Sequence, residues 1–140
     1  MSEPKKSLCV AIVEDDPYIS DLLTIRLRMA GYDSFVVDNG LLAPSVIADR
    51  MPDGIFLDLG LPGQDGFAVL KSLDTNELTR AIPVMIITAH GDRQEKTRAE
   101  AHGIVHFLVK PFNDQELLAR TSIMLNEDGP RRLIGPVTYI

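Results

Sequence analysis

The sequence predicts an α/β fold in which a parallel β-sheet is covered by helices on both faces. Short apolar runs alternate strictly with longer segments of helical periodicity, and several of the runs are continuously apolar. Continuous apolar runs are typical of parallel strands buried on both sides, and strict alternation indicates right-handed crossover connections. The expected strands are residues 8–13, 34–37, 54–57, 84–88 and 104–109.

The first expected helix, residues 17–30, has the clearest boundaries. Asp16 is a good N-cap, Pro17 suits the first helical position, and Gly31 suits the residue that follows the helix. Its apolar residues form one stripe that would face the sheet: Ile19, Leu22, Leu23, Leu27 and Ala30.

The remaining helices are expected at residues 41–50, 66–73, 92–103 and 114–125. Asn113 and Glu116 give the last of these a start similar to a capping box. Segment 92–103 is almost entirely polar, so it would bury little apolar surface and would be held weakly.

The composition agrees with one soluble domain. Of the 140 residues, 45% are hydrophobic and 24% charged, and no apolar stretch reaches the roughly 18 residues of a membrane span. The net charge of −6 disfavours binding to nucleic-acid phosphates, and Cys9, as the single cysteine, excludes an internal disulfide. Because the chain also starts with polar residues rather than a signal peptide, we expect a cytoplasmic protein without direct membrane or nucleic-acid contacts.

Four of the five expected strands end in polar or ionisable residues. The carboxyl ends of parallel strands share one edge of a sheet, where ligand sites of such folds lie, so we expect these side chains to converge. The residues are Glu14, Asp15 and Asp16 after the first strand, Asp58 after the third, Thr88 in the fourth and Lys110 after the fifth.

Several of these residues also have ordinary structural roles. Asp16 fits a helix N-cap, an aspartate such as Asp58 often opens a turn, and Thr88 is a normal β-branched strand residue. Glu14 and Asp15 precede the capping position, however, so capping does not account for them.

The combination of groups indicates phosphoryl chemistry. Carboxylates gathered at one edge repel one another unless a divalent cation lies among them, and oxygen ligands suit Mg²⁺. Lys110 lies between an apolar run and Pro111, which is an unusual place for a solvated lysine. The bond before a proline can also be cis, and a cis bond would let the turn direct a side chain inward. Three carboxylates, a hydroxyl and an ammonium are what metal-assisted transfer of a phosphoryl group onto a carboxylate needs.

The order and spacing of these motifs resemble the CheY-like receiver domains of two-component response regulators. The resemblance covers residues 6–126 and implies a single flavodoxin-like (βα)5 doubly wound sheet with strand order 2-1-3-4-5. It leaves residues 127–140 as a linker or tail, or as the start of an output domain that was removed. The motifs are Glu14-Asp15 and the segments 58–66, 87–89 and 107–112.

The resemblance also implies a role for each site residue. Asp58 would be the phosphoacceptor, and Asp15 and Asp58 would ligate Mg²⁺ (with Mn²⁺ as a substitute) together with the Gly60 carbonyl. Glu14 would act on the metal largely through water.

Three further side chains would respond to the phosphoryl group. Lys110 would pair with Asp58 and then with the phosphoryl group, Thr88 would bond a phosphoryl oxygen, and the Phe107 ring would turn inward. At Gly60 the family more often has a larger side chain, so we expect easier access of water and faster dephosphorylation.

The implied function is a signalling switch that catalyses only its own Mg²⁺-dependent phosphorylation and dephosphorylation. A sensor histidine kinase or phosphotransfer protein would supply the phosphoryl group. The face made by residues 92–103, 104–109 and 114–125 would then signal to an output domain or partner protein. A phosphorylation-linked homodimer is a further option.

Three alternatives stay open. A flavodoxin-like binding module shares the architecture, but a flavin phosphate site favours hydroxyl- and glycine-rich residues after the first strand, where this chain is acidic. A hydrolase with an aspartyl-phosphate intermediate would carry its nucleophile after the first strand and a cap, for which the chain is too short. A receiver-like interaction domain that takes no phosphate is disfavoured by Asp15, Asp58, Thr88 and Lys110.

Overall fold

A computed structural model describes residues 7–61, 65–89 and 91–126 of the chain. Within these ranges, five strands alternate with five helices. The strands are β1 (Cys9–Val13), β2 (Asp33–Val37), β3 (Gly54–Leu57), β4 (Val84–Thr88) and β5 (His106–Val109). The helices are α1 (Pro17–Met29), α2 (Ala43–Arg50), α3 (Gly66–Asp74), α4 (Arg93–Ala101) and α5 (Asp114–Asn126).

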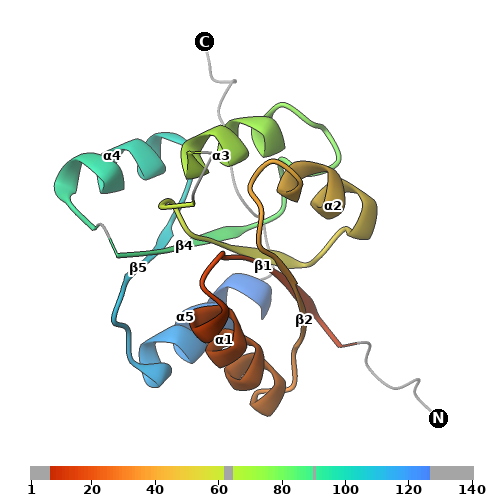
Figure 1. Ribbon diagram of the computed structural model, residues 1–140, viewed down its shortest axis with the longest axis vertical. Helices are drawn as coiled ribbons and strands as arrows, with labels where there is room; N and C mark the ends of the chain where they lie inside the picture. The colour runs from red at the N-terminus through yellow and green to blue at the C-terminus, as the bar shows by residue number, and fades with distance from the viewer. Residues whose placement is uncertain (1–6, 62–64, 90, 127–140) are drawn as a thin grey trace.

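All strand pairs in the sheet are parallel, and the strand order is β2-β1-β3-β4-β5, as expected. Helices α1 and α5 cover one face of the sheet, and α2, α3 and α4 cover the other (Figure 1). The chain crosses from one side of β1 to the other between β2 and β3. The carboxyl ends of β1 and β3 therefore lie at the position where doubly wound sheets bind ligands.

The core consists of two apolar layers, one on each face of the sheet. Along β1, Ala11 and Val13 belong to the layer under α2 and α3, whereas Val10 and Ile12 belong to the layer under α1 and α5. All four side chains are buried. Burial on both faces explains why the strand sequences are continuously apolar, and each buried Val or Ile contributes about 1.5–3 kcal/mol to stability.

Capping side chains set most helix starts. Asp16 accepts a hydrogen bond from the Tyr18 N–H (2.9 Å) at the start of α1, as predicted. Asn113 accepts one from the Glu116 N–H (2.7 Å), which is half of the predicted capping box. Gly31, after α1, has φ +92°, a conformation that side chains disfavour.

Some boundaries differ from expectation because turns extend further than the apolar pattern suggests. The fifth strand begins at His106 rather than at residue 104, because the Ile104 N–H donates to the Ala99 carbonyl and closes the end of α4. Helix α2 begins at Ala43 rather than at residue 41, because the Asn39 side chain first forms a turn with the Leu41 N–H (2.8 Å).

Two expectations concern residues outside the described ranges. These are the linker, tail or output-domain start at 127–140 and residues 62–64 of the segment after Asp58. Among the residues that the structure does describe, no helix has both the length and the hydropathy needed to cross a membrane.

Candidate functional site

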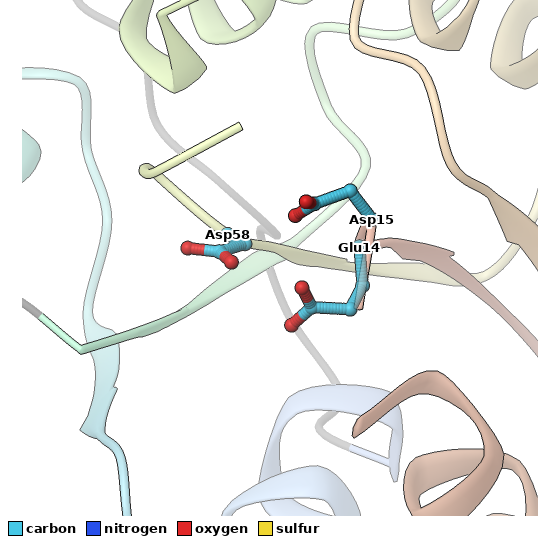
Figure 2. Close-up of side chains that lie close together, drawn as sticks. All are labelled: Glu14, Asp15 and Asp58. Carbon is cyan, nitrogen blue, oxygen red and sulfur yellow. The ribbon is translucent and has the colours of Figure 1, made fainter. Parts of the chain in front are cut away.

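Three carboxylates from the ends of β1 and β3 converge, as the sequence predicts. Glu14, Asp15 and Asp58 each have one carboxylate oxygen within 4.8 Å of the others (Figure 2). Glu14 is 2% exposed and Asp58 is 8% exposed, whereas Asp15 is solvent-exposed. The cluster is therefore open to water on one side and enclosed on the other.

The strand register brings these residues together. Val13 in β1 pairs with Leu57 in β3, and the Asp58 N–H donates to the Val13 carbonyl at 3.1 Å. The Glu14 N–H in turn donates to the carbonyl of Val37 in β2 (3.2 Å). The ladder thus continues for one residue beyond each strand, and it holds the two buried carboxylates side by side.

Lys110, at the end of β5, completes the cluster. Its Nζ lies 2.7 Å from Glu14 Oε1 and 3.0 Å from Asp58 Oδ2. The Lys110 N–H donates to the Thr88 carbonyl (2.7 Å), and the peptide bond to Pro111 is cis. One ammonium group therefore contacts both buried carboxylates.

Burial and charge shift two pKa values in the site. The pKa of Glu14 is raised to about 7, chiefly because burial disfavours the carboxylate and also because Asp58 is negative. Hydrogen bonds from Lys110 and the Asp16 N–H only partly oppose this. Burial by itself lowers the pKa of Lys110, but its hydrogen bonds to Glu14 and Asp58 outweigh burial, and the net pKa is raised. Lys110 is therefore an ammonium at neutral pH.

The residues present fit Mg²⁺. Three carboxylates face a single ammonium, so the cluster keeps an excess of negative charge for a divalent cation to compensate. Asp15 leaves the cluster open to solvent, which suits an ion that retains several of its waters.

Two backbone contacts to the carboxylates were not predicted from the sequence. The Gly60 N–H donates to Asp58 Oδ1 (2.9 Å), and the Asp16 N–H donates to Glu14 Oε2 (3.2 Å). In both contacts an acidic side chain accepts a hydrogen bond from the N–H two residues later. Asp side chains often do this in turns, so the contact between Asp58 and the Gly60 N–H could have been predicted. The two contacts orient one oxygen of each buried carboxylate.

The other two predicted residues lie at the ends of neighbouring strands. Thr88, the last residue of β4, is fully buried. Phe107 in β5 is partly buried against the core layer under α2 and α3. It lines a cavity of about 490 Å³ between α4 and β5, together with Lys96, Ala99, Glu100, Gly103, Ile104 and Val105.

Comparison with known proteins identifies the class to which this fold and acidic site belong. The family model of the response regulator receiver domain matches residues 10–122, and the chain belongs to that family. Receiver domains are the signalling modules of two-component systems; they bind Mg²⁺ at an acidic cluster and interact with histidine kinases or phosphotransfer proteins.

The chain is similar to the receiver portions of longer regulators. It is 42% identical over 116 residues to the DNA-binding dual master transcriptional regulator RpaA of Synechocystis sp., covering 83% of this chain and 48% of that protein. It is 36% identical over 128 residues to the phosphate regulon transcriptional regulatory protein PhoB of Pseudomonas aeruginosa, covering 91% of this chain and 56% of that protein. It spans about half the length of these curated relatives.

Among solved structures, the chain resembles the BeF3-activated N-terminal receiver domain of RstA from Klebsiella pneumoniae. The TM-score is 0.78 at 28% identity, and the match covers 85% of this chain and 99% of that one. The doubly wound fold is thus the fold of receiver domains.

Proposed function

We propose that Asp58 is the residue that accepts the phosphoryl group, in a reaction that needs Mg²⁺. The observation that carries this assignment is the convergence of Glu14, Asp15, Asp58 and Lys110 at the carboxyl edge of the sheet. One carboxylate oxygen of Asp58 accepts a hydrogen bond from the Gly60 N–H, and the other accepts one from the Lys110 ammonium. The carboxylate is therefore oriented before a phosphoryl donor binds.

In the proposed reaction, a carboxylate oxygen of Asp58 attacks the phosphorus atom, and the bond between phosphorus and the donor breaks. The product is an acyl phosphate on Asp58. Mg²⁺ would be held by Asp15, Asp58, the Gly60 carbonyl and, through water, Glu14, where it would neutralise charge on the phosphoryl oxygens. Mn²⁺ is a proposed substitute.

Lys110 has the second charge-neutralising role. Before the reaction its ammonium contacts both Glu14 and Asp58. After the reaction it would pair with the phosphoryl oxygens, which carry nearly two negative charges at neutral pH. The chain would catalyse only this self-phosphorylation and the hydrolysis of the acyl phosphate, in which water attacks phosphorus and inorganic phosphate and the Asp58 carboxylate are released. Gly60, which has no side chain, would leave the site open to that water.

The signal is proposed to leave through α4, β5 and α5. Thr88 would move to bond a phosphoryl oxygen, and the Phe107 ring would turn inward from its half-buried position. Reversing a 1:99 equilibrium needs about 5.5 kcal/mol. Two or three charge-assisted hydrogen bonds of about 1.5–3 kcal/mol each supply this energy.

The partners are proposed from the same argument. A sensor histidine kinase or a phosphotransfer protein would donate the phosphoryl group to a cytoplasmic domain formed by residues 6–126. Residues 127–140 would lead toward an output domain, and phosphorylation would favour a homodimer. Any contact with DNA or a membrane would be made by other parts of a longer protein.

The direct test is phosphorylation by acetyl phosphate with and without Mg²⁺, followed by intact-mass spectrometry. The wild-type chain should gain one phosphoryl group only with Mg²⁺, and Asp58→Asn should gain none. Asp38→Asn, which removes an exposed carboxylate outside the cluster, should label like the wild type. Persistent stoichiometric labelling of Asp58→Asn would refute the assignment, and an unlabelled wild type would favour an interaction domain that takes no phosphate.

A further inference from the structure

Helix α4 has little apolar attachment to the rest of the molecule. Ala99 is its single buried residue, and the helix is fully within the described part of the chain. A helix that buries so little apolar surface gains little stability from the core. Its position must therefore depend on other contacts.

Among the described residues, four side chains connect α4 and its C-cap to α3, and we call them the α3–α4 clamp: Phe67, Asp74, Arg98 and His102. The His102 Nδ1 lies 2.8 Å from Asp74 Oδ2, and these side chains are only 25% and 11% exposed. The His102 ring also stacks on Phe67, with centroids 5.9 Å apart and an interplanar angle of 30°. The Arg98 guanidinium lies over the same ring, 4.0 Å from its centroid.

Phe67 is thus contacted by Arg98 in α4 and by His102, the C-cap residue that follows the helix. It is 5% exposed, although it is only the second residue of α3. The exposed ion pair between Arg98 and Asp65, at 3.8 Å, adds little. The aromatic contacts and the partly buried His102–Asp74 pair therefore attach α4 to α3.

The start of α3 packs directly on the backbone that follows Asp58. A Cβ atom on Gly66 would lie 2.6 Å from the Leu59 Cα and 2.9 Å from the Asp58 carbonyl oxygen, so the two backbones are in contact. The Gly66 N–H also donates to the Leu59 carbonyl at 3.3 Å. The clamp therefore connects α4, through the first turn of α3, to the backbone of the proposed phosphoacceptor.

We propose that the α3–α4 clamp holds α4 in the position described above, in which Lys110 contacts the Asp58 carboxylate directly, and opposes phosphorylation of Asp58. This inference rests on the proposed function. In that function Thr88 moves toward the phosphoryl group, and the short segment after Thr88 leads directly into α4 at Arg93. We expect this movement to displace the first turn of α4, while Arg98 and the C-cap residue His102 anchor the other end of the helix to α3. Coupling between two sites is reciprocal. If phosphorylation of Asp58 weakens the clamp by a given factor, loss of the clamp must strengthen binding of a phosphoryl mimic by that factor.

The test measures binding of beryllofluoride with Mg²⁺ by NMR titration. Arg98→Ala with His102→Ala removes the clamp side chains of α4 and of its C-cap, and alanine at position 98 preserves helix propensity. The dissociation constant should fall about fivefold or more, a typical size for coupling between sites. Loss of a positive side chain by itself weakens binding of an anion, so a tighter complex cannot result from the change in charge.

Three further measurements separate the clamp from other effects. Gln94→Ala with Thr97→Ala changes two exposed α4 residues outside the clamp and should leave the dissociation constant unchanged. Asp74→Asn, on the α3 side, should tighten binding by more than Glu77→Gln, which removes the same charge from an exposed residue outside the clamp. Hydrogen exchange of α4 amides should be faster in the clamp variants than in the wild type.

The outcomes are distinct. Equal affinities of wild type and clamp variants would overturn the clamp, even if α4 exchanged faster, because α4 would then be loose without being coupled to Asp58. A wild-type chain that binds no beryllofluoride would instead overturn the proposed function. If the double variant fails to fold, Arg98→Ala alone should still show a smaller effect in the same direction, because Arg98 is exposed.

Discussion

Among the described residues, Glu14 has a side chain whose protonation the fold changes strongly. Its carboxyl is buried beside Asp58 and bonded to Lys110, and its pKa is raised to about 7. In the unfolded chain the ordinary value of 4.5 applies. Between these two values the folded state binds more protons than the unfolded state.

The free energy of unfolding should therefore fall as pH rises from about 4.5 to 7 in the absence of divalent cations. The decline due to Glu14 is at most about 3 kcal/mol. Urea unfolding over this pH range in EDTA measures it. Glu14→Gln should lose this decline and Glu77→Gln, which alters an exposed carboxylate, should retain it. Identical pH profiles for wild type and Glu14→Gln would contradict the prediction.

At the scale of secondary structure, α3 and α4 depend on different forces. Helix α3 buries five of its residues, including Val69, Leu70 and Leu73, and is part of the core. Helix α4 buries one and is attached by polar and aromatic contacts. Displacing α4, which the proposed signal requires, therefore exposes less apolar surface than displacing α3 would.

The contact between α3 and the phosphoacceptor backbone leads to a prediction at this scale. Gly66→Ala should destabilise the protein by about 1–3 kcal/mol, because the added Cβ meets main-chain atoms of Asp58 and Leu59 rather than the end of a flexible side chain. Thermal or urea unfolding measures the loss. Ser72→Ala, on the exposed side of α3, should cost much less. A Gly66→Ala variant as stable as the wild type would mean that α3 and the backbone after Asp58 separate easily.

At the scale of the whole molecule, the acidic cluster concentrates part of the net charge of −6 at one edge of the sheet. Its carboxylates repel one another in the folded state, and one lysine compensates only part of that charge. A ligand that binds only the folded state stabilises it in proportion to the logarithm of its concentration. Stability of the entire domain should therefore respond to Mg²⁺.

We expect Mg²⁺ at about 100 times its dissociation constant to add about 2.7 kcal/mol to the free energy of unfolding. The corresponding rise in Tm is measured by calorimetry. Asp15→Asn should reduce the rise strongly. Asp16→Asn removes the same charge one residue later but keeps an N-cap, so it should respond to Mg²⁺ like the wild type. An equal response of both variants would exclude Asp15 from the metal site.

Most of the fold followed from local patterns. The continuous apolar runs, the Asp16 cap and Gly31 after α1 are properties of neighbouring residues, and the structure confirms all three. Convergence of Asp15, Asp58 and Lys110 was predictable too, because parallel strands with right-handed crossovers bring their carboxyl ends to one edge.

What the sequence by itself determined is the alternation of elements and the edge at which the charged residues gather, because both depend on short-range periodicity and on the handedness of crossovers. Only the tertiary structure decided which atoms meet. Lys110 contacts Glu14 across 96 residues and Asp58 across 52, and His102 contacts Asp74 across 28. Such contacts depend on strand register, helix placement and burial acting together, and none of these is a property of a local segment.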